Sequence, residues 1–245
     1  MSNKPSNTSN TSKRKQAQQQ RQKKDQQRRL ITVMVIVGIA LIIMAIIVVP
    51  SLIPAEVASI TPVARPQENG RELGSATAPV VVEVFSDFQC PACGNYAESI
   101  EPLIVNSYVA DGRVRYIYRQ WPFLDDRVSR KESDQAANAS MCAADQGRFW
   151  DYHDILFANW NGENQGAYAN KRLVAMAEAL NLDMGAFNSC FDDNQFEADI
   201  NADLALGEQY GVNATPSIFV NGVKVESPDP TSLQQAIEQA LATGS

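Results

Sequence analysis

The fold of this chain is decided by residues 80–93, which read Val-Val-Val-Glu-Val-Phe-Ser-Asp-Phe-Gln-Cys-Pro-Ala-Cys. The first half of the stretch is rich in β-branched residues and, together with Pro79, predicts a strand over 79–85. The second half places Cys90 and Cys93 three positions apart, with a proline between them that suits the first turn of a helix. The stretch therefore predicts a strand that leads into a helix with two thiols at its start.

Two thiols at this position favour redox chemistry. The sulfur of Cys90 would face unpaired backbone N–H groups and the positive end of the helix dipole. Both stabilise a thiolate, so we expect Cys90 to have a depressed pKa and to be the exposed nucleophile. Cys93 lies one turn further into the helix and is expected to be the buried resolving thiol. The pair predicts thiol–disulfide exchange.

Helices and strands continue to alternate after the cysteines. A helix with one apolar face follows and should kink at Pro102, and residues 114–118 form a second strand, which completes a right-handed βαβ unit. Residues 131–210 change character: they are rich in Ala, Asp, Gln and Leu with helical periodicity, and they predict about three to five helices.

Strand signals return near the C-terminus. Residues 217–220 predict a strand, and Asn-Gly at 221–222 predicts a tight hairpin turn into 223–225. Asp229 and Pro230 then suit the N-cap and first residue of a final helix. The order is βαβ, a helical insertion over about 126–210, and ββα. This order predicts an α/β domain over 78–245, in which a mixed sheet is flanked by helices.

The N-terminal part has a different composition. Residues 1–29 hold nine Lys/Arg and one acid, and they have so little to bury that we expect a disordered basic tail. Residues 30–49 carry no charge, and 20 residues in a helix span the hydrocarbon core of a membrane. A cleaved signal peptide is the alternative, although its apolar part is usually about 7–15 residues long. The basic flank predicts a single-pass anchor with a cytoplasmic N-terminus and an extracytoplasmic domain.

Two further expectations follow from composition. Residues 50–77 contain four prolines and read as a linker between anchor and domain. From Pro54 onward there are 12 Lys/Arg and 27 Asp/Glu, a net charge of −15, which would repel phosphate backbones. Nucleic acid is therefore excluded as a partner of the domain.

The other two cysteines, Cys142 and Cys190, lie 48 positions apart in helical stretches. They could complete a zinc site with the CxxC pair, as could His153, but zinc ligands usually come as two closely spaced pairs, so we expect no metal. A structural disulfide between Cys142 and Cys190 would contribute about 4 kcal/mol through loop closure. Two buried free thiols and a second catalytic relay remain alternatives.

Three motifs carry a resemblance to a known family: FSDFQCPAC at 85–93, QGRFWDYH at 146–153 and GVNATPSIFVNG at 211–222. Together they resemble the DsbA-like thioredoxin-fold proteins, especially the membrane-anchored forms of Gram-positive and related bacteria. The resemblance covers about 75–243. It implies a thioredoxin-like sheet with an inserted helical domain, and no cofactor beyond the redox-active disulfide. It also implies a cis-proline at Pro216 facing that disulfide, with the backbone of Thr215 pairing with an extended substrate.

Two departures from the family pattern stand out. Many relatives carry a buried Glu six positions before the first cysteine, as proton acceptor for the resolving thiol, but Val84 occupies that position here. Glu83 should point to the other face of the strand, which leaves Asp87 as the candidate. The Pro-Ala dipeptide also lacks the His of the strongest oxidants, so a couple less oxidising than the roughly −120 mV of DsbA is expected.

These observations predict an extracytoplasmic oxidase that introduces disulfides into unfolded exported proteins. The resemblance implies re-oxidation by a quinone-linked membrane enzyme of the DsbB or vitamin K epoxide reductase type. An oxidase should lie above the roughly −180 to −230 mV of isomerases and glutaredoxins, which requires a Cys90 pKa of about 5–6. A reductase or isomerase on the same fold, or a non-catalytic peptide-binding chaperone, are the alternatives.

Overall fold

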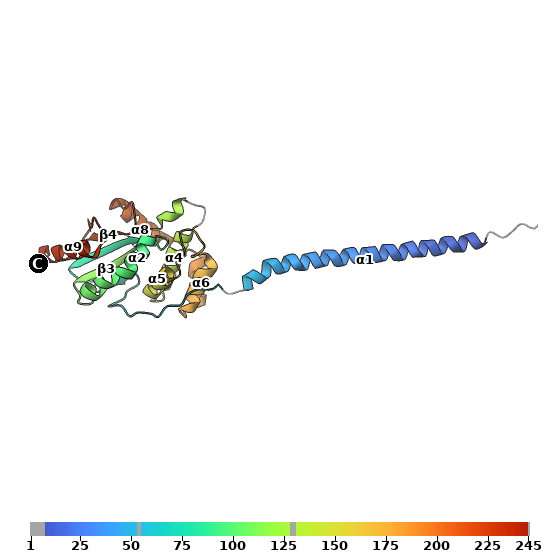
Figure 1. Cartoon of the computed structure of the whole chain (residues 1–245). Helices are drawn as coiled ribbons and strands as arrows, with labels where there is room; N and C mark the ends of the chain where they lie inside the picture. The colour runs from blue at the N-terminus through green and yellow to red at the C-terminus, as the bar shows by residue number, and fades with distance from the viewer. Residues whose placement is uncertain (1–7, 53–54, 128–130, 245) are drawn as a thin grey trace, which may run out of the picture. The chain divides into compact units, whose positions relative to one another are not determined.

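The chain divides into two units, Met1–Pro54 and Ala55–Ser245, in a computed structural model that describes residues 8–52, 55–127 and 131–244 (Figure 1). The first seven residues of the predicted tail, residues 53–54 of the predicted linker and residues 128–130 of the predicted insertion lie outside the described residues. Each unit is described by itself below.

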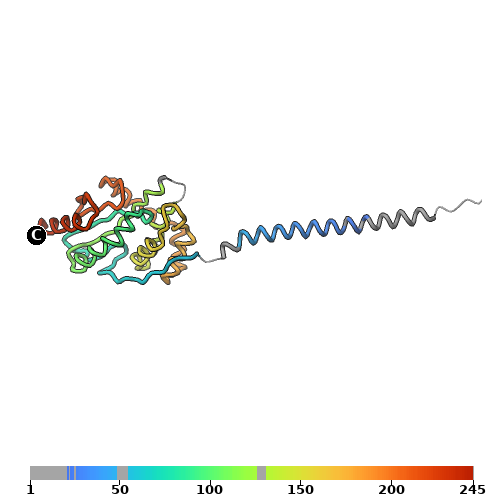
Figure 2. The backbone as a smooth tube through the Cα atoms, viewed as in Figure 1, coloured from blue at the N-terminus to red at the C-terminus, as the bar shows by residue number. Residues whose placement is uncertain are grey.

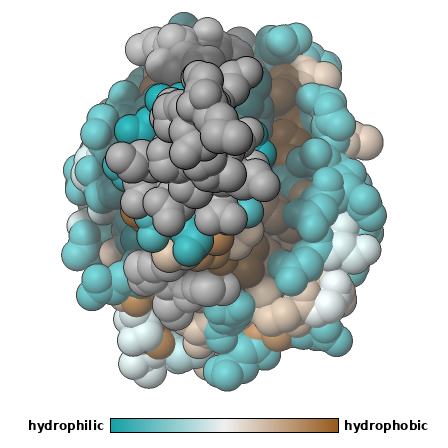
Figure 3. All heavy atoms as spheres, turned by 90° about the vertical axis from the view of Figure 1, so that its right-hand side faces the viewer, coloured by the Kyte–Doolittle hydropathy of each residue, from teal (hydrophilic) through white to brown (hydrophobic). Residues whose placement is uncertain are grey.

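The described residues of the first unit form one long helix, α1 (Thr8–Leu52). Its segment Gln26–Val48 is 23 residues long with a mean hydropathy of 3.2, long and apolar enough to cross a membrane as a single anchor. Its apolar side chains between Leu30 and Val48 are exposed. The face of the molecule in Figure 3 shows brown, hydrophobic atoms beside the grey ones.

The structure differs here from the expectation of a disordered tail over 1–29, because helix α1 already begins at Thr8. Gln, Lys and Arg are good helix formers in their own right, and the apolar segment that follows offers a helix to extend. Low hydrophobicity indicated that the tail has nothing to bury, but this does not prevent a helix that is continuous with its neighbour.

The second unit is built on a five-stranded sheet of order β1-β3-β2-β4-β5. Its central strands β2 and β3 are parallel and pair from Val80↔Val114 to Ser86↔Gln120, as the predicted βαβ unit requires. The other neighbours are antiparallel. The strands are β1 (Glu72–Leu73), β2 (Val80–Ser86), β3 (Val114–Gln120), β4 (Ser217–Val220) and β5 (Val223–Lys224).

Helices on either side of the insertion complete the core of this unit. After the cysteines, α2 (Pro91–Ser99) and α3 (Glu101–Ile104) are separated at Ile100 and followed by a π-helical turn, Val105–Val109. The break precedes Pro102, which has no N–H for the helix ladder, as predicted. The final helix, α9 (Pro230–Thr243), is capped by Asp229, whose carboxylate accepts the N–H of Ser232.

A second group of helices lies between β3 and β4, and runs from yellow-green to orange-brown in Figure 2. Within the described residues these are five, and a 3₁₀ turn, Phe123–Arg127, precedes them. Three of their aromatic side chains are completely buried: Trp150, Tyr152 and Phe187. The helices are α4 (Glu132–Ala144), α5 (Phe149–Ala158), α6 (Asn170–Ala179), α7 (Met184–Asp192) and α8 (Glu197–Gln209).

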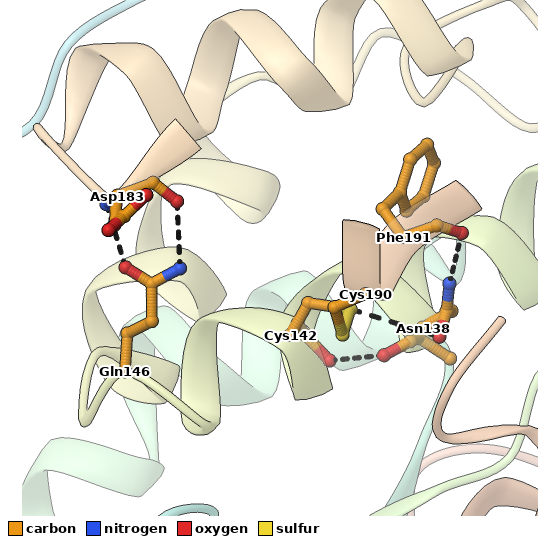
Figure 4. Close-up of a disulfide and its surroundings, with 8 residues drawn as sticks. Asn138, Cys142, Gln146, Asp183, Cys190 and Phe191 are labelled. Atoms are coloured by element: carbon orange, nitrogen blue, oxygen red, sulfur yellow. Dashed lines mark hydrogen bonds between the residues drawn. A yellow bond between two sulfur atoms is a disulfide. The ribbon is translucent and has the colours of Figure 1, made fainter. Parts of the chain in front are cut away.

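A disulfide joins Cys142 of α4 to Cys190 of α7, with the two Cα atoms 5.8 Å apart (Figure 4). Hydrogen bonds reinforce the same junction on both sides of the sulfurs. Asn138 donates its side-chain amide to the Phe191 carbonyl at 3.1 Å, and Gln146 exchanges two hydrogen bonds with the backbone of Asp183, 2.8 and 3.2 Å long. The bridge therefore fastens two helices of the insertion to each other.

The structure differs from the predicted linker over 50–77 at both ends of the segment and in its contacts with the domain. Leu52 still belongs to α1, and Glu72–Leu73 forms the edge strand β1 beside β3. Between them, residues 55–66 form a strap along the domain: Ala58 exchanges hydrogen bonds with the side chain of Asn159, and Arg65 is paired with Asp154. Four prolines indicated an extended segment correctly, but an extended chain can also lie along a surface.

Candidate active site

The CxxC pair lies where strand β2 ends and helix α2 begins. Cys90 is the N-cap of α2 in an extended conformation, and its carbonyl accepts the N–H groups of Cys93 and Gly94, both at 3.1 Å. Pro91 occupies the first helical position, as predicted. In this arrangement the two cysteines lie one helical turn apart, and both are free thiols.

The first cysteine is less accessible than expected. Cys90 is only 8% exposed and Cys93 only 1%, and both pack with Leu124. The expectation of an exposed Cys90 is therefore wrong, because the insertion and the loop before β4 fold over it. That loop contains the cis peptide bond Thr215–Pro216, and the Cys90 thiol donates to the Thr215 carbonyl at 3.5 Å.

The two thiols have opposite acid–base properties. A hydrogen bond from the Cys93 side chain, then one from the Thr215 side chain and those from the backbone N–H groups of Cys93 and Ala92, lower the pKa of Cys90 to about 6 against the opposing effect of burial. Burial raises the pKa of Cys93 well above its ordinary value. At neutral pH a pKa of about 6 leaves roughly ten thiolates per thiol. Of the two thiols, Cys90 is thus the better candidate for the nucleophile.

Asp87 joins the active-site loop to the insertion. Its carboxylate accepts hydrogen bonds from the Gln89 N–H (2.8 Å), the Leu124 N–H (3.1 Å) and the Ser133 hydroxyl (2.7 Å). Burial, which leaves the residue 1% exposed, raises its pKa to about 7 despite these three donors. A role as proton acceptor for Cys93 stays a prediction.

A buried acid of this kind should make stability depend on pH. A carboxyl whose pKa is raised on folding stabilises the protein fully below about pH 4, and this contribution is lost as pH rises through about 7. Three units correspond to about 4 kcal/mol. We expect the unfolding free energy of the Asp87→Asn variant to fall less than that of the parent between pH 5 and 8, by a few kcal/mol. Parallel urea-unfolding curves over this range would contradict the assignment.

Glu83, the other candidate acid, is engaged elsewhere. Its carboxylate accepts the guanidinium of Arg119 at 2.6 and 2.9 Å, and Tyr210 donates to it at 3.4 Å. Its neighbour Val84 belongs to the main core, so the alternation of β2 places Glu83 on the other face, as the sequence indicated. As a proton acceptor for Cys93 it is therefore the weaker candidate.

A zinc site that uses all four cysteines is ruled out by bonding, since Cys142 and Cys190 are bonded to each other. His153 is buried among aromatic rings, with its Nδ1 atom 2.9 Å from Asp154. No group of three or more His, Cys, Asp or Glu side chains suited to a metal occurs among the described residues. The sulfur atoms near the start of α2 are therefore those of Cys90 and Cys93, which can form a disulfide with each other.

Comparison with known proteins places this arrangement in a family. A family model described as thioredoxin matches residues 67–239, which include all five strands of the sheet, both cysteines of the CxxC pair and all of α9 except its C-terminal end.

The chain belongs to the thioredoxin family.

Within this family, the similarity is to DsbA-like proteins. The crystal structure of oxidised BdbD from Bacillus subtilis superimposes with a TM-score of 0.64 at 25% identity, covering 77% of this chain and all of that one. Disulfide bond formation protein D of Bacillus subtilis is 27% identical over 173 residues, covering 69% of this chain and 76% of its own length. The resemblance to the DsbA-like thiol–disulfide oxidoreductases, and the thioredoxin-like fold that it implied, are confirmed.

A further relative has a different name. The Na⁺/H⁺ antiporter NhaA 3 of Salinispora tropica is 33% identical over 171 residues, which cover 69% of this chain. The chain spans about a quarter of that protein's length, since the match covers 24% of it. The ion exchange in its name is a property of the antiporter.

One feature of this thioredoxin-family site could not be found from the motifs. A buried ionic cluster lies beside α2, in which Arg65 of the strap donates to both oxygens of Asp154 at 3.0 and 2.8 Å. Arg65 also lies 3.6 Å from Glu101 and over the ring of Trp150. Tyr116 donates to Glu101 at 3.1 Å. The only signal in the sequence was an isolated arginine in a proline-rich segment.

Proposed function

We propose that this chain is an extracytoplasmic thiol–disulfide oxidase that introduces disulfides into exported proteins through Cys90 and Cys93. The observation that carries the proposal is the pairing of a Cys90 thiol whose pKa is lowered to about 6 with a buried Cys93 whose pKa is raised. A stable Cys90 thiolate favours the reduced pair, and this makes the disulfide form a good electron acceptor. The names of the disulfide bond formation proteins support the same direction.

The exchange proceeds in two steps that balance in atoms and electrons. A client thiolate attacks the Cys90 sulfur of the Cys90–Cys93 disulfide, forming a mixed disulfide and releasing Cys93 as a thiolate that takes up a proton. A second client thiolate attacks the client sulfur of the mixed disulfide and releases the Cys90 thiolate. The client loses two electrons as its disulfide forms, and the CxxC pair gains them. The two sulfurs carry these electrons, so no other cofactor is needed.

The groups around Cys90 have parts in these steps. The Thr215 carbonyl, 3.5 Å from the Cys90 sulfur, belongs to an edge on which an extended client backbone could pair beside Pro216. Return of the pair to the disulfide form requires an electron acceptor. We propose a quinone-linked membrane oxidase of the DsbB or vitamin K epoxide reductase type, which would accept the two electrons from the reduced pair.

The apolar helix supports a location for this activity. Segment Gln26–Val48 could anchor the chain in the cell membrane by a single span. The nine basic residues before Leu30 would keep the N-terminus in the cytoplasm and the catalytic domain outside. Thiols of newly exported clients are oxidised in such a compartment.

The test of the proposed direction is the reduction potential of the Cys90–Cys93 couple. A Cys90 pKa of about 6 lies between the roughly 7 of thioredoxin and the roughly 3.5 of DsbA, whose potentials are roughly −270 and −120 mV. If the potential changes linearly with the pKa between these two proteins, the couple should lie at about −230 mV or higher, and below that of DsbA. Equilibration of the full chain with glutathione buffers measures it, and thiolate absorbance of the Cys93→Ala variant measures the pKa.

The alternative on the same fold is a reductase or isomerase supplied with electrons across the membrane. The couple of a reductase would lie near that of thioredoxin. A Cys90 pKa of 7 or above, together with a potential near −270 mV, would overturn the oxidase and favour the reductase.

A further inference from the structure

A cavity of about 690 Å³ opens beside Cys90, in the size range of ligand-binding pockets. It is lined by α2 and the turns after it, by α5 and by strap residues 63–65, and we call it the α2–α5 groove. Among the described residues, the Thr215–Pro216 loop does not contribute to its lining. The groove is therefore a separate surface from the cis-proline edge, and the two surfaces share Cys90.

One wall of the groove is apolar and already ordered. Phe157 packs against the cluster formed by Cys90, Cys93 and Leu124. The indole N–H of Trp160 donates to the Gln89 carbonyl at 2.8 Å, which holds a half-exposed ring in place. Gly94 of α2 lies close to this aromatic wall, because a Cβ atom there would be in van der Waals contact with the Phe157 ring at 3.5 Å. A side chain that entered beside Cys90 would meet aromatic surface without first reorganising it.

The charges of the groove are unbalanced. Its lining carries the carboxyl groups of Glu98, Glu101 and Asp154 and the guanidinium of Arg65. Arg65 is committed to Asp154 by two hydrogen bonds and to Glu101 at 3.6 Å, and Glu98 is exposed at the rim. Burial raises the pKa of Glu101, but with that carboxyl neutral the lining is still negative by one charge. An aromatic ring beside uncompensated carboxylate suits cationic side chains.

We propose that the α2–α5 groove binds the polypeptide segment next to the client's reacting cysteine and prefers a basic side chain there over an acidic one. The inference rests on the proposed function, because the client cysteine must reach the Cys90 sulfur. Cys90 is itself part of the groove lining, so residues close to the client cysteine pass over or into the groove. The cis-proline edge would pair with the client backbone, and the groove would select among its side chains.

The test compares two short synthetic peptides with one cysteine each. In the arginine peptide the cysteine is flanked by phenylalanine and arginine, and in the aspartate peptide by phenylalanine and aspartate. Each reacts with the oxidised full chain in detergent, and acid quenching followed by mass spectrometry gives the rate of mixed-disulfide formation. We expect the arginine peptide to react about tenfold faster at low salt, with the ratio decreasing as salt screens the charges. The Glu98→Lys variant should lower the ratio to about twofold or less.

Matched variants separate local from long-range effects. Glu208→Lys makes the same charge change at an exposed position of α8 outside the groove, and should leave the ratio near that of the parent. Ala158→Trp, at an exposed position of the groove wall, should slow both peptides several-fold by filling the space.

Uncharged 2-mercaptoethanol monitors the proposed function separately, because it needs only the disulfide. If it reacts normally with the parent while the two peptides react at equal rates, or if Glu208→Lys and Glu98→Lys change the ratio equally, the groove assignment is overturned. If 2-mercaptoethanol fails to open the disulfide of the parent, the proposed function fails.

Discussion

Replacement of Cys90 by serine is expected to lower the rate of disulfide transfer to a reduced client by at least about a thousandfold. A serine hydroxyl cannot form the mixed disulfide, and the remaining Cys93 is 1% exposed with its pKa raised, so it is a poor nucleophile at neutral pH. Oxidative refolding of a reduced, unfolded client with the full chain in detergent measures the rate. The residual rate should equal that of the client with buffer oxidant alone.

The matched control is Cys93→Ser. This variant keeps the Cys90 nucleophile but has no resolving thiol, so it should accumulate a covalent complex with the client that reductant releases. A different result would support a peptide-binding chaperone. In that case neither the parent nor Cys90→Ser would oxidise the client, and both would prevent its aggregation equally well.

Removal of the Cys142–Cys190 bridge is expected to destabilise the domain by about 4 kcal/mol without changing the redox chemistry. The bond closes a loop across a sequence separation of 48, and its loss restores conformational entropy to the unfolded chain. Urea unfolding of the Cys142→Ala/Cys190→Ala variant measures the loss. Fluorescence reports on the domain specifically, because the three tryptophans are Trp121, Trp150 and Trp160.

The control variant is Ser189→Ala, an exposed position in α7 beside Cys190, which should stay within about 0.5 kcal/mol of the parent. The rate of disulfide transfer through Cys90 should be the same in the double variant as in the parent at low temperature. A lower transfer rate in a fully folded double variant would favour a redox relay through these cysteines over a structural role.

The elements that could be predicted from the sequence are those with strong local signals. The β-branched run placed β2 within one residue, because a fully buried central strand is apolar on both faces. Asp229 and Pro230 marked the start of α9, because a cap and a first-turn proline are local chemistry. The position of the two active-site thiols followed in the same way from the strand before them and the proline between them.

The features that could not be predicted depend on contacts distant in sequence. Edge strand β1 has only two residues, and its pairing with β3 is specified by the partner. The burial of Cys90 results from Leu124 and the Thr215–Pro216 loop, neither of which is near it in the chain. The sequence argument also attributed the low pKa of Cys90 chiefly to the helix start, whereas the largest contribution is the hydrogen bond from Cys93.

The strap is the clearest case of a missed element. Its proline content is compatible with either a free tether or a docked chain, and local sequence does not distinguish them. Docking depends on the hydrogen bond from Ala58 to the side chain of Asn159 and on the ion pair between Arg65 and Asp154. Asn159 and Asp154 lie more than 80 residues further along the chain than their partners. An arginine among prolines has no local partner that would reveal this.

The Cys142–Cys190 bridge also has a consequence for how copies of the protein mature. A newly made chain has four thiols, and closing this bridge releases two electrons that an oxidant must accept. Under the proposed function, a mature neighbour with an oxidised Cys90–Cys93 pair is such an oxidant, so the protein is among its own clients. Each mature copy would then catalyse formation of the Cys142–Cys190 bridge in newly made copies. The mature population would grow autocatalytically from the first copies, which must be oxidised by other means.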